Sequence, residues 1–241
     1  MQIYNKDCFD FFAETPSNFC NHIFTSPPYN RKRNDKYELY DDTVADYYQF
    51  IEKLAIESLR ISREFVFINI QKNYYNKKDV FNFIGKFSEQ IKEIFIWNKS
   101  NPMPASGNNI TNGYEFVFAM SKHDKSLKSN KTYTINSFTT SVAKMSKSHK
   151  AIMNQKVSDF FIANFTKEND LIIDPMCGLG TTGLSCKKFN RKFIGIELIP
   201  EYSELAKTRV LTETTSNKKE GWGERETFNN IIFLWISATN L

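Results

Sequence analysis

Residues 171–183 read LIIDPMCGLGTTG, an apolar run that predicts a short strand, a glycine loop and the start of a helix. Gly178 and Gly180 allow the backbone to turn tightly and to approach a ligand without a Cβ clash. Thr181 and Thr182 follow at once and can cap the helix or offer hydroxyls. A phosphate-binding P-loop needs Gly-Lys-Ser/Thr, so the Thr after Gly180 excludes that motif. The stretch therefore predicts a cradle for a nucleoside-like cofactor at the end of a parallel strand.

Two acidic residues flank this cradle. The next predicted strand, residues 192–196, leads into Glu197, where a carboxylate can accept both ribose hydroxyls of a nucleoside. The alternative for Glu197 is an ordinary carboxylate at the end of a strand. Asp174 is placed to meet a cationic amino acid group. S-adenosylmethionine (AdoMet) carries an ammonium and a sulfonium, so carboxylates without Lys or Arg favour AdoMet over NAD, whose pyrophosphate needs donors.

Residues 25–30 read TSPPYN and offer a second kind of chemistry. The exocyclic amine of cytosine or adenine is a poor nucleophile, because its lone pair is delocalised into the ring. Ser26 Oγ and the Pro27 carbonyl can accept hydrogen bonds from the amine and favour the charge that develops on it. Pro28 stiffens the turn, and Tyr29 can stack on a base that has left the duplex. A polar turn is the alternative for this motif taken alone.

Predicted strands and helices alternate along most of the chain, which predicts an α/β fold with a mostly parallel, mixed sheet and helices on both faces. The strands are expected at 1–4, 20–25, 64–70, 91–97, 115–120, 171–174 and 192–196, and the helices at 7–13, 43–61, 78–90, 156–164, 181–188 and 201–210. Residues 31–42 and 101–112 are expected to be loops. We see no internal repeats.

Composition sets broad limits on the kind of protein. A length of 241 residues with 41% hydrophobic residues suits one domain with a packed core. The four Cys have no CxxC spacing and the three His are scattered, so we expect reduced thiols, a cytoplasmic location and no metal centre. No apolar run approaches the length of a membrane span, and no signal peptide is recognisable.

The net charge of +5 is mild, but its distribution is uneven. Residues 120–150 contain seven lysines and one acid, Asp124, with Ser, Thr and Asn between them. The segment is either a solvated loop or a lobe that faces DNA phosphates. We expect the loop at 31–42 to close near the base. The predicted DNA contacts are Lys144, Lys147, Asn30 and Arg31.

Seven segments together resemble the β-class amino-methylating DNA methyltransferases, in which the catalytic motif precedes the AdoMet loop. They are IYNKDCFDFF (3–12), TSPPYN (25–30), WNKSNPMP (97–104), YEFVFAMSK (114–122), SHKAIMNQKV (148–157), DPMCGLGTTG (174–183) and GIELIPEY (195–202). The resemblance covers residues 1 to 210 and implies a Rossmann-like AdoMet-dependent methyltransferase fold with a small recognition insert at 101–150. The tail, residues 211–241, stays open as a strap, a contact in a homodimer or an artefact of expression.

The resemblance also implies the residues of each site. The expected catalytic residues are Ser26, Pro27, Pro28 and Tyr29, and the expected cofactor residues are Asp7, Cys8, His149, Ala151, Asp174, Pro175, Gly178, Gly180, Thr181, Thr182 and Glu197. Cys177 is excluded as a nucleophile for ring-carbon methylation, because it lies inside the cofactor loop and not in a Pro-Cys element.

These observations predict methyl transfer from AdoMet to a flipped-out base of double-stranded DNA. In the family that the chain resembles, Ser in the catalytic motif usually accompanies cytosine N4, and Asp usually accompanies adenine N6. The sequence therefore favours cytosine N4, with adenine N6 as the alternative. An inactive DNA-binding member and an RNA or protein methyltransferase are the more remote alternatives. A restriction endonuclease is an expected companion of such an enzyme.

Overall fold

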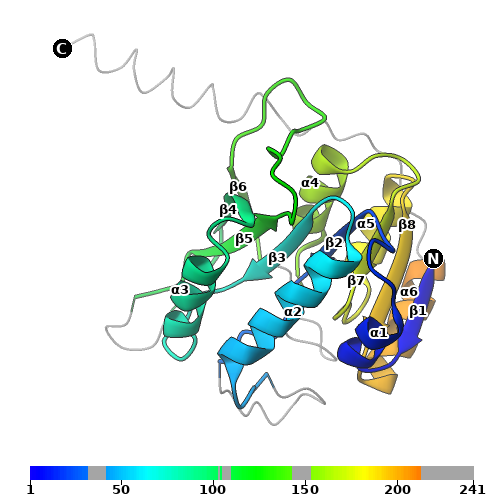
Figure 1. The fold of residues 1–241 in the computed structure, drawn as a ribbon, viewed down its shortest axis with the longest axis horizontal. Coiled ribbons are helices and arrows are strands. Elements are labelled where there is room, and N and C mark those ends of the chain that lie inside the picture. The colour runs from blue at the N-terminus through cyan, green and yellow to red at the C-terminus, as the bar shows by residue number, and fades with distance from the viewer. Residues whose placement is uncertain (32–41, 103, 105–109, 143–152, 213–241) are drawn as a thin grey trace.

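The chain folds around one mixed sheet, seen in the computed structural model, which describes residues 1–31, 42–102, 104, 110–142 and 153–212 (Figure 1). The strands are β1 (Gln2–Asn5), β2 (His22–Thr25), β3 (Val66–Ile70), β4 (Ile91–Lys99), β5 (Tyr114–Met120), β6 (Ser137–Thr140), β7 (Leu171–Asp174) and β8 (Lys192–Glu197). The helices are α1 (Cys8–Glu14), α2 (Tyr47–Ile61), α3 (Lys77–Lys86), α4 (Gln155–Phe165), α5 (Thr181–Lys188) and α6 (Pro200–Thr212).

The strand order is β1-β8-β7-β2-β3-β5-β4-β6. β5 runs antiparallel to both of its neighbours, and every other pair is parallel. From β7 the chain continues outward to β8, and from β2 it continues outward in the other direction to β3. The order therefore reverses between β7 and β2, which is the place where open α/β sheets bind ligands.

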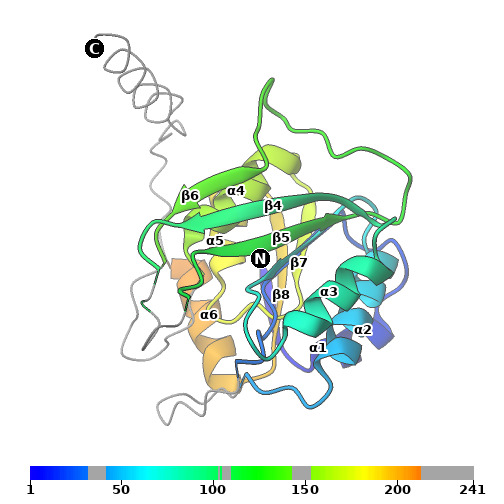
Figure 2. The ribbon, with the colours of Figure 1, turned by 90° about the vertical axis from the view of Figure 1, so that its left-hand side faces the viewer.

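Helices cover both faces of the sheet, as Figure 2 shows with α1, α2 and α3 on one side and α4, α5 and α6 on the other. Successive strand side chains point to opposite faces, so neighbouring residues enter different cores. Ile23 packs in the core under α1, α2 and α3, whereas Phe24 packs in the core under α4 and α5. Rings of Phe24, Phe67, Phe95 and Phe161 fill the second core with centroids 5.1–6.5 Å apart. The predicted fold class is confirmed.

Helix α2 differs from its predicted extent. It begins at Tyr47 and not at Thr43, because Asp46 caps it by accepting a hydrogen bond from Gln49 N at 3.0 Å. The helical spacing of the apolar residues over 43–61 predicts one buried face, made of Tyr47, Phe50, Ile51, Leu54, Ile56 and Leu59. The prediction is wrong at Ile56, which is 49% exposed. Tyr47, Ile51, Leu54 and Leu59 are buried as predicted. The next helix, α3, ends at Lys86, four residues earlier than predicted.

The expected insert at 101–150 contains a strand that the sequence analysis missed. β6 pairs with β4 in parallel, and Trp97 Nε1 donates to the Thr140 carbonyl at 3.2 Å. Phe138 stacks on Phe160 with centroids 4.4 Å apart. Only alternate residues of β6 are buried, and its neighbours in sequence are polar. The formation of this strand therefore depends more on contacts with β4 and α4 than on the pattern of its own residues.

The ends and the middle of this range lie at opposite edges of the sheet. β4 and β6 end, and β5 begins, at the edge where β2, β3 and β7 end. Lys122 and Lys125 instead lie at the amino edge, where Lys122 Nζ donates to the Arg60 carbonyl at 3.0 Å and Lys125 pairs with Glu64. Lys122 and Lys125 therefore lie at the opposite edge of the sheet from the ends of β4 and β6.

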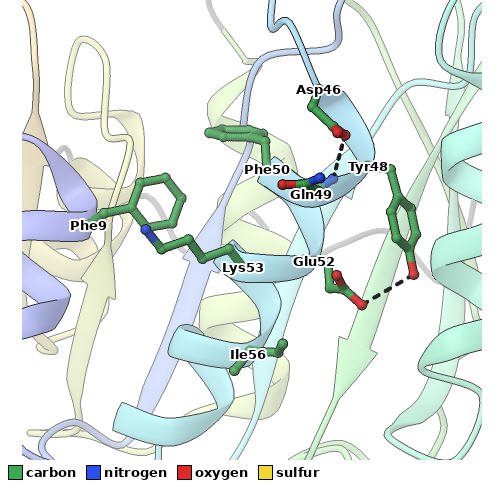
Figure 3. Close-up of a pocket in the computed structure, with 8 residues that line it drawn as sticks. All are labelled: Phe9, Asp46, Tyr48, Gln49, Phe50, Glu52, Lys53 and Ile56. Carbon is green, nitrogen blue, oxygen red and sulfur yellow. Dashed lines mark hydrogen bonds between the residues drawn. The ribbon is translucent and has the colours of Figure 1, made fainter.

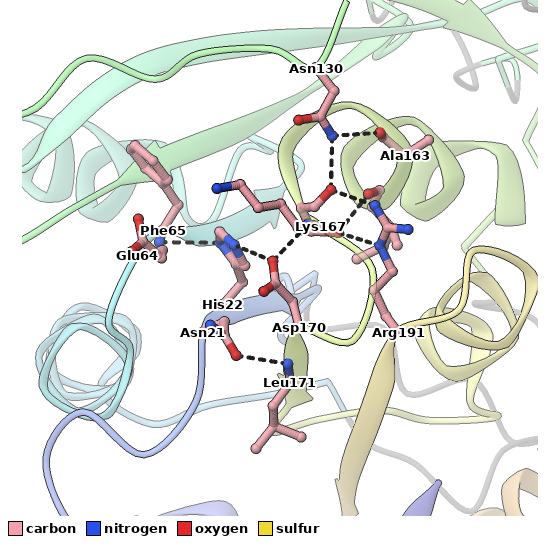
Figure 4. Close-up of polar contacts among 12 residues, drawn as sticks. Asn21, His22, Glu64, Phe65, Asn130, Ala163, Lys167, Asp170, Leu171 and Arg191 are labelled. Carbon is pink, nitrogen blue, oxygen red and sulfur yellow. Dashed lines mark hydrogen bonds and ion pairs between the residues drawn. The ribbon is translucent and has the colours of Figure 1, made fainter.

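The amino edge is tied together by His22 and Asp170 (Figure 4). His22 Nδ1 accepts a hydrogen bond from Phe65 N at 3.3 Å, so its Nε2 carries the proton and faces Asp170 Oδ2 at 3.3 Å. Burial alone would raise the pKa of Asp170, but hydrogen bonds from His22 and from Lys167 N hold that pKa below its ordinary value. This histidine joins β2 to β7 and is structural.

Candidate active site

The predicted site residues converge at the carboxyl edge of the sheet. Asp7 follows β1, Glu197 ends β8, Asp174 ends β7 and Ser26 follows β2. Asn5 pairs with Glu197, Asp174 pairs with Gly195, and Ile23 pairs with Ile173, so these strands lie side by side in this order. Adjacent strands are about 4.8 Å apart. The glycine loop and the SPPY turn are therefore neighbours across the switch point of the sheet.

Asp174 is enclosed by its own loop and is only 4% exposed. Its Oδ2 accepts from Thr182 Oγ1 at 2.6 Å and its Oδ1 accepts from Met176 N at 3.1 Å. Burial raises the pKa of Asp174 to about 6, against the opposing effect of these hydrogen bonds. Each oxygen still has a lone pair to offer. The carboxylate thus shapes the loop and gives it a negative charge.

The two glycines of the loop serve different purposes. Both have positive φ, +51° at Gly178 and +75° at Gly180, which is the left-handed region that favours glycine. A Cβ on Gly180 would lie 2.8 Å from Val210 Cγ2, so this glycine is required by the packing of α6. A Cβ on Gly178 would meet nothing within 4 Å. Open space for a ligand is therefore found at Gly178.

The expected caps of α5 were wrong in detail. Its N-cap is Gly180, with no side-chain cap hydrogen bond, and Thr181 and Thr182 are the first two helical residues. Thr182 is turned toward Asp174 instead, and Pro175 is buried beneath the loop.

Glu197 is held by two backbone amides. Gly178 N donates to Oε2 and Ile199 N donates to Oε1, both at 2.9 Å. Burial raises the pKa of Glu197, and the backbone amides oppose that rise. After the adjacent strand β1, Asp7 caps α1 by accepting from Phe9 N at 2.7 Å, and Cys8 is buried. Two carboxylates beside an open glycine suit the ammonium and ribose of AdoMet.

None of the four cysteines has the properties of a nucleophile. All four are free and buried. Burial raises the pKa of Cys8 and Cys20 to about 12, and burial beside Asp174 and Glu197 raises that of Cys177 well above its ordinary value. A thiol with a raised pKa is a weak nucleophile at neutral pH. Within the described ranges no three His, Cys, Asp or Glu side chains are grouped to hold a metal ion.

The hydroxyl groups of the SPPY turn belong to a buried polar network. Ser26 Oγ and Tyr29 OH are 2.7 Å apart, and Tyr29 OH donates to Glu115 Oε2 at 2.9 Å. Asn69 Nδ2 contacts Ser26 Oγ at 3.3 Å and Glu115 Oε2 at 2.7 Å. Lys99 Nζ pairs with Glu115 Oε1 at 2.8 Å. Ser26 and Tyr29 are half-buried, Pro27 is buried and Pro28 is half-buried.

This network fixes the direction of the Ser26 hydroxyl. Burial, followed by the charge of Glu115, raises the pKa of Tyr29 well above its ordinary value, so the phenol keeps its proton. A carboxylate only accepts, so the single proton of Tyr29 goes to Glu115. Ser26 must then donate to Tyr29 if their 2.7 Å contact is a hydrogen bond. Asn69 Nδ2 donates to Ser26 Oγ, so one lone pair of Ser26 Oγ is left to accept from another group.

Sequence reasoning missed Asn69, Glu115 and Lys99. The available signal was polarity inside apolar strands, in VFINI for Asn69 and in YEFVFAM for Glu115. Alternation along the strands places Asn69, Glu115 and Asp174 on the face covered by α4 and α5.

The predicted DNA contacts fall into two groups. Asn30 is 5% exposed and its Oδ1 accepts from Val44 N at 3.2 Å, so its position does not support a contact with DNA. The Arg31 guanidinium lies 5.3 Å from the Tyr29 ring centroid. Lys144, Lys147, His149 and Ala151, and most of the predicted closing loop at 31–42, lie outside the described residues.

A groove of about 750 Å³ lies between α1 and α2 (Figure 3). Lys53 Nζ sits 4.2 Å above the Phe9 ring, and Phe50 meets the same ring edge to face at 6.0 Å. None of the predicted site residues lines this groove. The groove is therefore separate from the predicted site residues, which lie where the strands end.

The fold and the two loops define a Rossmann-like AdoMet-dependent methyltransferase. The chain belongs to the N6/N4 DNA methylases, because the family model N6_N4_Mtase, described as DNA methylase, matches residues 20–208. AdoMet is therefore its methyl donor. No helix among the described residues is long and apolar enough to cross a membrane.

Similar proteins cover nearly the whole chain. Type II methyltransferase M2.DpnII of Streptococcus pneumoniae is 26% identical over 246 residues, which cover 90% of this chain and 92% of that protein. Type II methyltransferase M2.MboI of Moraxella bovis is 26% identical, with 90% of each chain covered. Among solved structures, PvuII DNA methyltransferase (cytosine-N4-specific) has a TM-score of 0.72 at 20% identity and covers 90% of this chain and 88% of its own. The M1.HpyAVI–SAM complex has a TM-score of 0.63 at 25% identity, with 86% and 98% covered.

Proposed function

We propose that this DNA methyltransferase acts on the N4 amino group of cytosine and that Ser26 orients that amine. The observation that carries the proposal is the direction of the Ser26 hydroxyl. Because Tyr29 donates to Glu115, we infer that Ser26 donates to Tyr29, and the lone pair of Ser26 Oγ that Asn69 does not use can accept from an N–H group. A neutral acceptor at this position suits the exocyclic amine, and the fold neighbour PvuII DNA methyltransferase is named as cytosine-N4-specific.

The reaction needs the amine to leave the plane of the base. Hydrogen bonds from its two N–H groups to Ser26 Oγ and to the Pro27 carbonyl favour the pyramidal geometry and the positive charge on nitrogen. AdoMet, when bound, supplies the electrophilic methyl group. The Ser26 hydroxyl is too weak an acid to ionise at neutral pH, so it does not act as a base. Its role is to orient the amine, and the proton that the amine loses after transfer leaves to water.

The target base must be extruded from the duplex before it can reach this edge, at a cost of a few kcal/mol. We infer that Tyr29 holds the extruded base against its ring. The Tyr29 hydroxyl donates a hydrogen bond to Glu115, and the backbone carbonyl of Tyr29 accepts one from Asn73 Nδ2 at 2.6 Å. A ring fixed at both ends loses little entropy when a base stacks on it.

Cofactor binding is assigned to the open side of the glycine loop. We propose that the backbone at Gly178 approaches AdoMet, that Glu197 accepts the ribose hydroxyls, and that Asp174 attracts the ammonium. Support comes from the positive φ and free space at Gly178 and from the oriented carboxylate of Glu197. Asp7 and Cys8, at the start of α1, are assigned to the adenine side, and His149 and Ala151 are assigned to the cofactor as the resemblance implies.

We propose that DNA docks on the loops that leave the carboxyl edge after β4 and β6. These are the segments 100–113 and 141–154. Their first residues are in contact, since Asn101 Oδ1 accepts a hydrogen bond from Val142 N at 2.7 Å. Lys144 and Lys147 belong to the second segment. Each phosphate contact contributes about 0.9 to the slope of log affinity against log salt. A Lys144→Gln/Lys147→Gln variant should show a smaller slope than Lys122→Gln, its control at the amino edge, and equal slopes would contradict the assignment.

Mass spectrometry of nucleosides from DNA treated with the enzyme and AdoMet tests the target base. N4-methylcytosine is the expected product, and N6-methyladenine as the only product would overturn the cytosine assignment. Sequencing of the methylated DNA would give the recognition site in the same experiment.

We further propose that the enzyme protects the sites of a companion restriction endonuclease, because the relatives are named Type II methyltransferases. DNA methylated by the enzyme should resist cleavage by that endonuclease, while untreated DNA should be cut. A homodimer remains part of the proposal, and sedimentation of the purified protein tests it.

A further inference from the structure

Two adjacent tyrosines, Tyr74 and Tyr75, are exposed on the loop that joins β3 to α3. Their exposed fractions are 78% and 53%, and their rings meet edge to face with centroids 5.4 Å apart. β3 ends at the carboxyl edge, so this aromatic pair lies on the same side of the sheet as Ser26. Exposed apolar groups that gather beside a site mark a surface that contacts another molecule.

The loop that carries the pair is fastened to the catalytic motif. Asn73 Nδ2 and Asn76 Nδ2 both donate to the Tyr29 carbonyl, at 2.6 and 2.9 Å. The two asparagines also bond each other, since Asn73 N donates to Asn76 Oδ1 at 2.7 Å and Asn76 N donates to Asn73 Oδ1 at 3.2 Å. Tyr74 follows Asn73 directly, so these hydrogen bonds also fix the position of the Tyr74 backbone relative to Tyr29. A contact made by the pair therefore needs no prior ordering of the loop.

Three lysines flank the aromatic pair in sequence: Lys72, Lys77 and Lys78. Lys77 and Lys78 are exposed, and Lys77 Nζ lies 5.0 Å from the Tyr74 ring centroid. None of the three is within ion-pair distance of an acidic group in the described part of the chain. Aromatic rings beside unpaired cations match a nucleic acid, whose bases stack on the rings and whose phosphates take the charges.

We propose that Tyr74 and Tyr75 form a stacking subsite for the DNA bases next to the extruded base, with Lys72 and Lys77 on the flanking phosphates. Extrusion unstacks the neighbouring base pairs, and an aromatic side chain placed beside them replaces part of the lost stacking. The subsite is fixed to the turn that would receive the base. The inference rests on DNA methylation and holds for either target base.

Binding measurements on Tyr74→Ala test the subsite. The probe is a short duplex that carries the site at which the wild-type enzyme deposits methyl groups, with 2-aminopurine next to the target base. Tyr74→Ala should weaken duplex binding about tenfold, the scale of one lost base–aromatic stack, and should raise 2-aminopurine fluorescence. Tyr74→Phe should behave as wild type. Tyr133→Ala is the matched control, because Tyr133 is also 78% exposed but follows Asn130, which is anchored to the end of α4.

Two results would overturn the subsite. One is a Tyr74→Ala/Tyr75→Ala variant that binds the duplex and quenches the probe like Tyr133→Ala. The other is a wild-type dimer that becomes a monomer in the same variant, as measured by sedimentation, while the intrinsic affinity for DNA is unchanged. That result would make the tyrosine pair part of a subunit interface. The wild-type nucleoside product is read separately, so failure of the cytosine assignment would leave this comparison intact.

Discussion

Glu115 Oε1 lies 2.8 Å from Lys99 Nζ, and the side chains of the two residues are only 5% and 7% exposed. The other oxygen of Glu115 accepts from Tyr29 and Asn69. Burying an ion pair carries a desolvation cost. The attraction between the two charges offsets that cost only when the pair makes further hydrogen bonds. Here those hydrogen bonds reach the SPPY turn, so the ion pair fixes the position of Tyr29 and, through it, that of Ser26.

Replacing Glu115 should therefore slow methyl transfer while AdoMet binding persists. Glu115→Gln removes the charge that pairs with Lys99 and leaves one acceptor oxygen where Lys99, Tyr29 and Asn69 now share two. Tyr29 is then held less firmly, and a small displacement of a positioned group can cost about 10²-fold in rate. Single-turnover methylation and calorimetric AdoMet titration measure the two effects separately. Glu64→Gln, which breaks the exposed pair with Lys125 at the amino edge, should leave both unchanged. Equal rates for the two variants would show that Glu115 is only structural.

Ser26→Ala should slow turnover by about 10²–10³-fold, the usual effect of removing a preorganised polar partner. AdoMet affinity should stay at the wild-type value, because the cofactor is assigned to the strands on the other side of the switch point. Ser26→Thr keeps a hydroxyl and should retain part of the activity. A Ser26→Ala enzyme with the wild-type rate would remove Ser26 from the mechanism.

Local patterns made half of the site predictable. The apolar run before Asp174, the glycines and the helix after them lie in one continuous stretch, so periodicity and turn chemistry were enough to place the loop at the end of a strand. The SPPY motif was equally easy to recognise, because it consists of four consecutive residues. Both converge because parallel strands end at the same edge.

The remainder depends on pairing between distant strands. Asn69 and Glu115 are brought together by the antiparallel pairing of β3 with β5, and Lys99 joins them from β4. No local pattern encodes that register. β6 was missed for the same reason, because its burial comes from Phe160 on α4 and Trp97 on β4. The amino-edge position of Lys122 likewise followed from the direction of β5, which charge counting does not reveal.

AdoMet affinity should depend on pH through Asp174, whose pKa is raised to about 6 by burial. The ammonium of AdoMet favours the ionised carboxylate, so binding should be constant above pH 7 and weaken as pH falls through 6, by at most about tenfold per unit. Calorimetric titration between pH 5 and 8 checks this. Asp174→Asn should bind weakly at every pH, and an unchanged pH profile in that variant would exclude Asp174 as the titrating group.

Stability of the protein without AdoMet should follow the opposite trend. The ordinary pKa of Asp in an unfolded chain is about 3.9, so between about pH 4 and 6 the folded state binds more protons than the unfolded state. The contribution of Asp174 is therefore fully present below pH 4 and is lost as pH rises through 6. Denaturant unfolding of wild type and Asp174→Asn across this window should show the difference between them growing with pH.

Substitutions at the two loop glycines should separate cofactor binding from folding. Gly180→Ala places a Cβ 2.8 Å from Val210 Cγ2 at a φ of +75°, so it should lower the free energy of unfolding by about 1–3 kcal/mol from overpacking, with further strain from the left-handed backbone. Gly178→Ala meets nothing within 4 Å and should cost only about 1 kcal/mol of backbone strain, yet it should weaken AdoMet binding strongly because the new methyl group occupies the space assigned to the ligand. Gly85→Ala, an open position within α3, is the control that should alter neither property unfavourably. Thermal unfolding with and without AdoMet measures both effects, and a Gly178→Ala protein with wild-type AdoMet affinity would move the cofactor away from this loop.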